Sequence, residues 1–519
     1  MQRIIAYLLL LVVCSLPVMA EGLFQNITHE MKKDIKKVTL SNGLTLIMMR
    51  RTDSPTLALY TKFKVGSVDE TPDIAGTSHM LEHMMFKGTK NIGTKNFAKE
   101  EKYHELLKKY GSALDKLRLE ARKYRSIGAE VPEELNQEIK EHEKSVKIYE
   151  DIQKRYVIKS EDNLIYTQNG QVGFNAYTTT DVTNYQIQLP ANRLELWAKI
   201  ESDRLKNPIL RGFYSERNVV MEERRMRVDN RGIGVLREKF IGAAFEQHPY
   251  RMPVIGYAPN IPYLDIYETK KYFRKFYSPN NMVIAIVGDL NFQETEMIVK
   301  RYFSGLQPSK DLPEIRTQEN YEWGERRVTV KYPSSPIFMM GWHKPTFPHP
   351  DNSAFDVLDL LLTGGASSRL FKRLVLQDKL ARTINAWNGD PGERYSNLFT
   401  IYTRPNSDAD IKKLEAAIWE ELERIKKGEI EQKEIDLIKN KLIASFFRGI
   451  DNNATLADLL SYYELITGDW ANLFKAYENL YHIKPDDIQK VAKKYLIREN
   501  VTVGNLVDTR KRKKKHAKK

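Results

Sequence analysis

Apolar and polar positions divide the chain into two stretches of similar pattern. The first stretch opens with KKVTLSNGLTLIMMRR, in which two apolar runs flank Asn42-Gly43, a dipeptide typical of a hairpin turn. A strand-like run, TLALYTKFKVGS, and a helical segment follow. The second stretch opens with strand-like RRVTVKY and PIFMMGW and continues into the helical NSAFDVLDLLLTGG. The order of elements predicts two units that each combine a sheet with helices.

The ends of the two stretches are also alike, which predicts a duplication. KKYFRKFYSPNNMVIAIVGDL and QKVAKKYLIRENVTVGNLVD both read as helix, turn and buried strand, with Asn281 and Asn500 at matching places. We therefore expect an α+β fold of two homologous domains, each an antiparallel-rich sheet packed with helices. The predicted boundaries are 21–307 for the first domain, 308–322 for a linker and 323–508 for the second domain.

Residues 97–158 do not fit the repeat. They are highly charged, have apolar residues at helical spacing and are broken once, at EVPEE. This pattern predicts an antiparallel helical hairpin inserted in the first domain. Its role is either decoration or a docking arm or lid. Its polar faces predict that the hairpin is dispensable for folding.

The N-terminus has the pattern of an export signal. Arg3 precedes the apolar run IIAYLLLLVVCSLPVMA, which ends in small residues and predicts a signal peptide at 1–20. The alternative is an uncleaved N-terminal anchor. Because the only cysteine, Cys14, lies inside this segment, the mature chain has no thiol nucleophile and no disulfide.

The net charge of +14 is concentrated at the C-terminus. RKRKKKHAKK alone carries eight positive charges, which predicts a disordered basic tail at 509–519. With an export signal, contact with an anionic membrane surface is a better use of this tail than nucleic-acid binding. We expect no nucleic-acid partner.

The candidate chemistry lies in HMLEH, which contains His79 and His83 one helical turn apart. Both imidazoles project from one face of a helix, and Zn–N bonds of about 2.0–2.1 Å allow them to hold one ion. Glu82 lies at the edge of that face and is placed to act as general base toward a water molecule beside the metal. This H-x-x-E-H order is the inverzincin signature. The alternative is a helix with exposed histidines and no metal.

A third ligand is predicted in YSERNVVMEERRM. Glu216 and Glu223 are two helical turns apart and share a face, with Val219 and Val220 expected between them. Carboxylates on an inward face are costly unless they are paired, and a metal ion would resolve that cost. We expect Glu223 to be the ligand and Glu216 to orient a ligand histidine, whereas Glu222 meets solvent. The alternative is a solvated acidic and basic helix surface.

These motifs together resemble the M16 (pitrilysin- and insulinase-like) zinc peptidases, especially exported bacterial members with two domains per chain. GTSHMLEHMMFKGT is similar to the metal-binding helix of the family, and SERNVVMEERRM to the segment with its third ligand. GFNAYTTTDVTNYQIQLP resembles the family's edge strand, and LTGGASSRLFKRL the start of its catalytically silent second domain. The hairpin accounts for a longer spacing between the second and third ligands than relatives have.

The resemblance implies a zinc endopeptidase that cleaves short, unfolded peptides in the periplasm of a Gram-negative bacterium. It implies one Zn²⁺ per chain, in the first domain, and Glu82 as the base. The implied zinc ligands are His79, His83 and Glu223. The implied substrate-binding residues, on the edge strand that accepts a peptide as an extra strand, are Asn175, Ala176 and Tyr177.

The second half departs from the family pattern. Many relatives carry there an Arg and a Tyr, seven residues apart, that bind the substrate carbonyl, whereas this chain has Val375 and Arg382 at those positions. The second half also has Phe355, Leu358 and Asp359 where the first half has its His, Glu and His.

The missing pair implies a second M16-like subunit that supplies the Arg and Tyr. A homodimer and a monomer that uses Arg382 are the alternatives. Two non-enzymatic functions also stay open, namely an M16-like scaffold and a subunit that binds peptides without cutting them.

Overall fold

A computed structural model describes residues 17–319 and 324–510 of the chain, with side chains from residue 21 onward. Most of the predicted signal peptide, part of the predicted linker and nearly all of the basic tail lie outside the described residues. The chain divides into a first unit, residues 37–224 and 253–314, and a second unit, residues 1–36, 225–252 and 315–519. None of the helices in the described ranges combines the length and the apolar content needed to cross a membrane.

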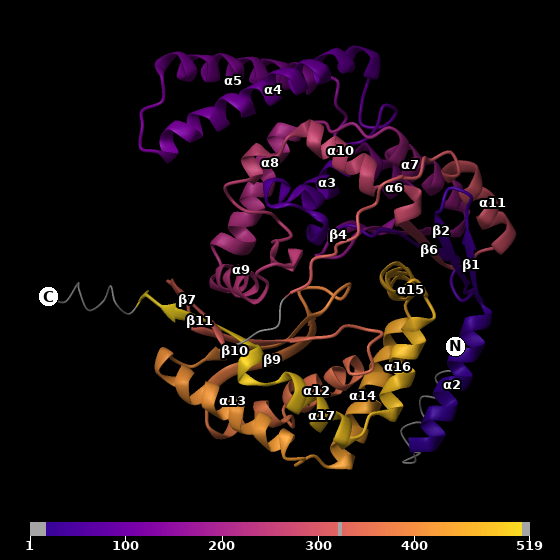
Figure 1. Ribbon diagram of the computed structural model, residues 1–519. Helices are drawn as coiled ribbons and strands as arrows, with labels where there is room; N and C mark the ends of the chain where they lie inside the picture. Colours follow the sequence, from indigo (N-terminus) through magenta and orange to yellow (C-terminus); the bar gives the residue numbers. More distant parts are fainter. Residues whose placement is uncertain (1–16, 320–323, 511–519) are drawn as a thin grey trace. The chain divides into compact units, whose positions relative to one another are not determined.

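A six-stranded sheet forms the centre of the first unit, in the order β1-β2-β6-β3-β5-β4. Figure 1 labels β1, β2, β4 and β6 of this sheet. Its strands are β1 (Ile35–Thr39), β2 (Thr45–Arg50), β3 (Thr56–Phe63), β4 (Val172–Thr178), β5 (Thr183–Pro190) and β6 (Met282–Gly288). The apolar strand β6 is buried along its whole length, pairs parallel with β2 and antiparallel with β3. Strand β4 lies at the edge and pairs with β5.

The helices of the first unit support this sheet and position the site. They are α3 (Thr77–Met85), α4 (Phe97–Ser126), α5 (Glu133–Gln153), α6 (Glu161–Gln168), α7 (Leu194–Lys206), α8 (Phe213–Arg224), α10 (Ile266–Phe276) and α11 (Phe292–Phe303). Helix α3, which carries the two histidines, packs against α8 and α10. A hydrogen bond between the hydroxyl groups of Ser78 and Tyr272, 2.9 Å long, fixes α3 to α10.

The second unit is built on a five-stranded sheet in the order β7-β11-β8-β10-β9. Its strands are β7 (Arg326–Tyr332), β8 (Ile337–Lys344), β9 (Ala381–Asp390), β10 (Asn397–Pro405) and β11 (Val501–Asp508). Its helices are α2 (Pro17–Lys33), α9 (Gly232–Ala244), α12 (Asn352–Thr363), α13 (Ile411–Lys426), α14 (Gln432–Ile450), α15 (Asn453–Thr467), α16 (Asn472–His482) and α17 (Pro485–Tyr495).

Helices cover both faces of this second sheet. Met340 and Trp342 of β8 face a core that α12, α13 and α17 complete. Gly341, between them, faces the other way, and a side chain there would meet the ring of Phe240 on α9 at 2.8 Å. The small residue therefore allows α9 to lie close against the sheet.

The predicted duplication is confirmed by the sheet topology. In both units the last strand pairs parallel with one strand and antiparallel with the next, because β6 lies between β2 and β3 as β11 lies between β7 and β8. The two matching asparagines also make equivalent hydrogen bonds. The Asn281 side chain donates to the carbonyls of Phe276 and Lys64, and the Asn500 side chain donates to those of Tyr495 and His343.

The compact units differ from the predicted linear domains in two respects. Residues 225–252, which we placed in the first domain, belong to the second unit, because α9 packs on β7 and β11. Residues 17–36 also belong there: Phe24 on α2 lies among the rings of Phe446, Phe447 and Tyr481. The sequence pattern identifies apolar helix faces but does not say which sheet they cover.

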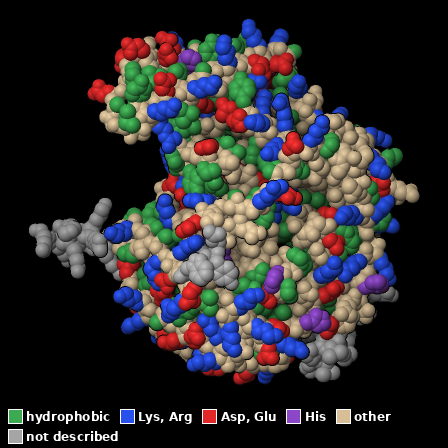
Figure 2. Space-filling view, in the orientation of Figure 1, with side chains coloured by type: hydrophobic (Ala, Val, Ile, Leu, Met, Phe, Trp, Pro, Cys, Tyr) green, Lys and Arg blue, Asp and Glu red, His purple; other side chains and the backbone are tan. Residues whose placement is uncertain are grey.

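The helical hairpin at 97–158 is present as α4 and α5, which run antiparallel (Figure 1). Leu107, Leu114 and Val146 form its own small apolar core. Figure 2 shows charged side chains of both signs over its surface, in line with the polar faces that the sequence predicts.

Two buried ion pairs argue against the prediction that the hairpin is dispensable for folding. Glu100 of α4 is fully buried and accepts a hydrogen bond of 2.7 Å from the buried Arg211. Asp115 binds the buried Arg217 through two hydrogen bonds of 2.7 and 3.0 Å. Excision would remove the carboxylate partners of both arginines and uncover the surface on which α4 packs. We expect a chain without 97–158 to be insoluble.

Two single substitutions compare the buried ion pair of the hairpin with one of its exposed ion pairs. Asp115→Ala should lower the free energy of unfolding by about 3–5 kcal/mol, because Arg217 loses its buried partner. The matched control is Glu143→Ala, which removes the exposed ion pair with Arg118 and should cost no more than about 1 kcal/mol. Urea denaturation compares the two variants, and equal small effects would contradict the anchoring role.

Candidate metal centre

Helix α3 presents its two histidines on one face, as the sequence predicts. The ring centroids of His79 and His83 lie 4.8 Å apart. The start of the helix is held by a residue that the sequence did not reveal: the buried Glu70 carboxylate accepts from the backbone N–H groups of Gly76 and Ser78, at 2.7 and 2.6 Å. A carboxylate at this end satisfies open helix N–H groups and interacts favourably with the helix dipole.

Helix α8 brings Glu223 to these histidines. Oε2 of Glu223 lies 3.6 Å from Nε2 of His79 and 3.2 Å from Nε2 of His83. Ligand atoms held about 2.0–2.1 Å from a tetrahedral zinc ion lie about 3.3–3.4 Å from one another. Both nitrogen–oxygen distances are close to this spacing, and the three ligand atoms all lie within 4.8 Å of one another. Among the described residues, no other group of three or more His, Cys, Asp or Glu side chains is placed to hold a metal.

The second predicted carboxylate, Glu216, lies behind His83. Its Oε1 atom is 3.0 Å from Nδ1 of His83, and its Oε2 atom is 2.6 Å from the ammonium of Lys87. Burial would raise the pKa of Glu216, but the hydrogen bonds from His83 and Lys87 outweigh it and lower that pKa. An ionised carboxylate at Nδ1 fixes the ring so that Nε2 points to the ligand position. Nδ1 of His79 is buried and has no such partner within the described ranges.

Two carboxylates raise the pKa of His83. Burial lowers the pKa of His83, but the hydrogen bonds with Glu216 and Glu223 raise it to about 9. Because a histidine ligand must be neutral, metal binding at neutral pH would release a proton from His83.

Glu82 lies beside the ligands without being one of them. Its Oε2 atom accepts a hydrogen bond of 2.6 Å from the hydroxyl of Thr178, the last residue of β4. Glu82 therefore contacts the edge strand of the sheet. Thr178 and Lys87 were missed by the sequence reasoning, although the position of Lys87, one helical turn after His83, was a usable signal.

The predicted substrate-binding residues all lie on this edge strand. Asn175 is exposed, Ala176 is buried and Tyr177 is half-buried, with its hydroxyl 3.1 Å from the Lys62 ammonium. One expectation about α8 is wrong. Val220 is buried, but Val219 is 49% exposed and does not lie on the inward face. Glu222 is exposed, as expected.

The positions of the second unit that correspond to the histidines of α3, and to the Arg/Tyr pair of relatives, lie in different surroundings from the metal site. Phe355 and Leu358 of α12 are fully buried in the apolar core, so this helix face packs where α3 presents its histidines. Val375 packs against the same core, and Arg382 is exposed on the edge strand β9.

Lys87 is expected to contribute to metal affinity through Glu216. Lys87→Met removes the cation that balances Glu216 and should weaken zinc binding about tenfold, the low end of the effect of such supporting groups. Competition with a chromogenic chelator measures the affinity. The matched control is Lys95→Met, because Lys95 is exposed in the same loop and forms no ion pair with any described residue. Equal affinities in both variants would contradict this role.

Comparison with known families places two profiles along the chain. The profile described as "Insulinase (Peptidase family M16)" matches residues 46–116, which include the two histidines and Glu82. The profile described as "Peptidase M16 inactive domain" matches residues 264–442. The first match ends within α4, where the helical hairpin extends from the unit.

Relatives and solved structures match nearly the full length. The chain is 27% identical over 467 residues to the zinc protease PqqE of Helicobacter pylori, covering 89% of this chain and 90% of that protein. It is 22% identical over 476 residues to an uncharacterized zinc protease of Streptomyces coelicolor, covering 89% and 87%.

Two structures show the fold. A protease from Helicobacter pylori has a TM-score of 0.73 at 26% identity, covering 91% of this chain and 99% of that chain. The first half of the periplasmic protease PqqL from Escherichia coli has a TM-score of 0.64 at 17% identity, covering 92% of each chain. From these profiles and zinc-protease relatives, we conclude that the chain belongs to the M16 family of peptidases.

Proposed function

We propose that the chain is an exported zinc endopeptidase that cleaves short, unfolded peptides. The observation that carries this proposal is the spacing of the nitrogen and oxygen atoms of His79, His83 and Glu223, with the separate carboxylate of Glu82 beside them. Export is supported by the pattern of the first 20 residues and by the description of the E. coli relative PqqL as periplasmic.

Each residue has a distinct part in hydrolysis. Zinc held by His79, His83 and Glu223 would acidify a water molecule and polarise the substrate carbonyl. Glu82 takes the proton of that water and later delivers it to the leaving amine. Thr178 donates to one oxygen of Glu82 and so fixes the orientation of the carboxylate.

The edge strand β4 is the proposed substrate platform. An extended peptide adds to the open edge of a sheet through main-chain hydrogen bonds, which makes binding tolerant of sequence. Because Thr178 ends β4 and contacts Glu82, a peptide along Asn175, Ala176 and Tyr177 would run toward the base. Folded proteins cannot present such a strand, so the substrates are unfolded segments.

We further propose that a second M16-like subunit completes the active enzyme. Charge that develops on the substrate oxygen needs hydrogen-bond donors. Val375, which stands where many relatives have arginine, has no donor side chain, and Arg382 stands where they have tyrosine. This chain covers 48% of the PqqL chain, so in PqqL a unit of this size is joined to more chain. A homodimer and a monomer that uses Arg382 are the alternatives.

A non-catalytic scaffold or peptide-binding subunit is the second candidate function. The observation that favours it is the absence of the Arg/Tyr pair, together with a second half that matches an inactive domain. Such a protein would bind peptides on β4 without turnover.

The test is a zinc and turnover measurement on the purified chain 21–519. We expect about one zinc per chain, because the described residues contain one set of zinc ligands. We expect weak cleavage of a quenched unstructured peptide, lost with a chelator, restored by zinc and raised by the M16-like product of a neighbouring gene. Full activity of the chain alone, abolished by Arg382→Ala, would overturn the proposal that a second subunit is needed. Zinc binding with no turnover under any of these conditions would favour the non-catalytic function.

A further inference from the structure

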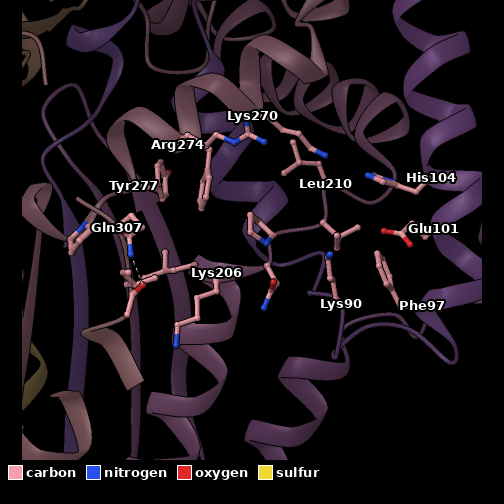
Figure 3. A pocket seen from close by; sticks show the side chains of 18 of the residues that line it. Lys90, Phe97, Glu101, His104, Lys206, Leu210, Lys270, Arg274, Tyr277 and Gln307 are labelled. Carbon is pink, nitrogen blue, oxygen red and sulfur yellow. Dashed lines mark hydrogen bonds between the residues drawn. The ribbon is translucent and has the colours of Figure 1, made fainter. Parts of the chain in front are cut away.

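A cavity of about 640 Å³ lies in the first unit, apart from the metal ligands, at the base of the helical hairpin. Its walls come from the start of α4, from α10, from the turn after α7 and from residues 305–308 (Figure 3). Cavities of this size are typical of small-molecule sites. None of the zinc ligands, Glu82 or the β4 residues lines it, so the proposed peptidase chemistry does not use it.

Positive side chains dominate the lining. Four cationic residues, Lys90, Lys206, Lys270 and Arg274, face two carboxylates, Glu101 and Glu105. Glu105 is already paired with the Lys108 ammonium at 2.5 Å. In the described part of the chain, no carboxylate lies within the 4.0 Å ion-pair distance of any of the four cations. Burial and the nearby Lys108 lower the pKa of Lys270 to about 8, and they outweigh the opposite effect of Glu105.

A buried histidine also lines the cavity. His104 is only 3% exposed, lines the cavity, and its ring extends from α4 toward Lys270 (Figure 3). Its Nε2 atom is buried and has no hydrogen-bond partner among the described residues. A buried polar atom without a partner costs about 1–3 kcal/mol, so such atoms call for an explanation. Burial and the adjacent cations lower the pKa of His104 to about 3, so the ring is neutral.

Part of the remaining wall is apolar. Phe97, Leu210, Phe273 and Tyr277 line the cavity, and the Lys90 ammonium lies 5.6 Å from the centroid of the Phe97 ring. An inorganic ion would leave this surface uncovered. A ligand with an anionic head for Lys270 and Arg274, and an organic body for the aromatic wall, would use both parts.

We propose that this cavity, here called the basic pocket, binds a phosphorylated organic small molecule. Lys270 and Arg274 of α10 would hold the phosphate oxygens through charge-assisted hydrogen bonds. The ligand would lie between α4 of the hairpin and α10. This proposal does not depend on the proposed peptidase activity.

Calorimetric titration of the purified full chain tests the proposal, with AMP, pyrophosphate and adenosine as probes. We expect AMP to bind, pyrophosphate to bind more weakly and adenosine not to bind measurably. The double variant Lys270→Gln/Arg274→Gln should weaken AMP binding at least about tenfold, as loss of charge-assisted contacts implies. The control Lys271→Gln removes an exposed lysine of the same helix and should leave binding unchanged.

Several outcomes would overturn the proposal. These are no binding of AMP, equal binding of AMP and adenosine, and an equal loss of affinity in Lys271→Gln and in the double variant. Stronger binding of pyrophosphate than of AMP would overturn the inference that the ligand has an organic body. A second measurement uses the wild-type chain only: AMP should protect Lys270, but not Lys271, from acetylation, as read by mass spectrometry. Equal acetylation of Lys270 with and without AMP would also overturn the proposal.

Discussion

Glu82→Gln is expected to lower peptide turnover by about 10²–10⁴-fold, the range that a positioned general base contributes, while zinc content stays at the wild-type level. Glutamine keeps the shape of the side chain, and its carbonyl oxygen still accepts from Thr178, but it cannot take a proton. The three atoms of the ligand set are untouched. Steady-state assay with a quenched peptide and metal analysis of the same preparation measure the two quantities.

The control for this prediction is Thr178→Val, which keeps the carboxylate and removes only its hydrogen bond. We expect a smaller loss of turnover, because the base is present but less well oriented. A Glu82→Gln variant that keeps more than about a tenth of wild-type turnover would exclude Glu82 as the base.

Glu223→Gln is expected to remove most of the zinc. A neutral amide is a much poorer zinc ligand than a carboxylate, and the site loses its only negative ligand. Metal analysis after dialysis measures the loss, and circular dichroism checks that the fold is retained. Glu222→Gln is the matched control, because Glu222 is adjacent in sequence but exposed. Full zinc in the first variant with loss in the second would show that the register of α8 is wrong.

The local parts of the site could be predicted from the sequence because their geometry repeats along one helix. His79, Glu82 and His83 share a single turn, and Glu216 and Glu223 share a face of α8. Each spacing fixes a direction in space without reference to the rest of the chain. The packing of α3 against α8 then brings the two sets together.

The parts that depend on tertiary contacts could not be predicted in this way. Thr178 reaches Glu82 from a strand 96 residues away. Glu100 and Asp115 look like solvated charges on a polar helix, but they are buried against arginines from another segment. A binary pattern of polar and apolar positions is the same for a solvated charge and for a buried ion pair, so the anchoring of the hairpin was missed.

The assignment of α9 to the second unit has a consequence for limited proteolysis. The chain leaves the first unit after Arg224, enters the second unit and returns at Pro253. A protease that cuts once between 308 and 324 therefore yields two fragments, of which the N-terminal one still carries α9 and α2 of the second unit. Because Phe240 of α9 lies against Gly341 and Gly504, those fragments would stay together as a nicked complex under native conditions and separate only in denaturant.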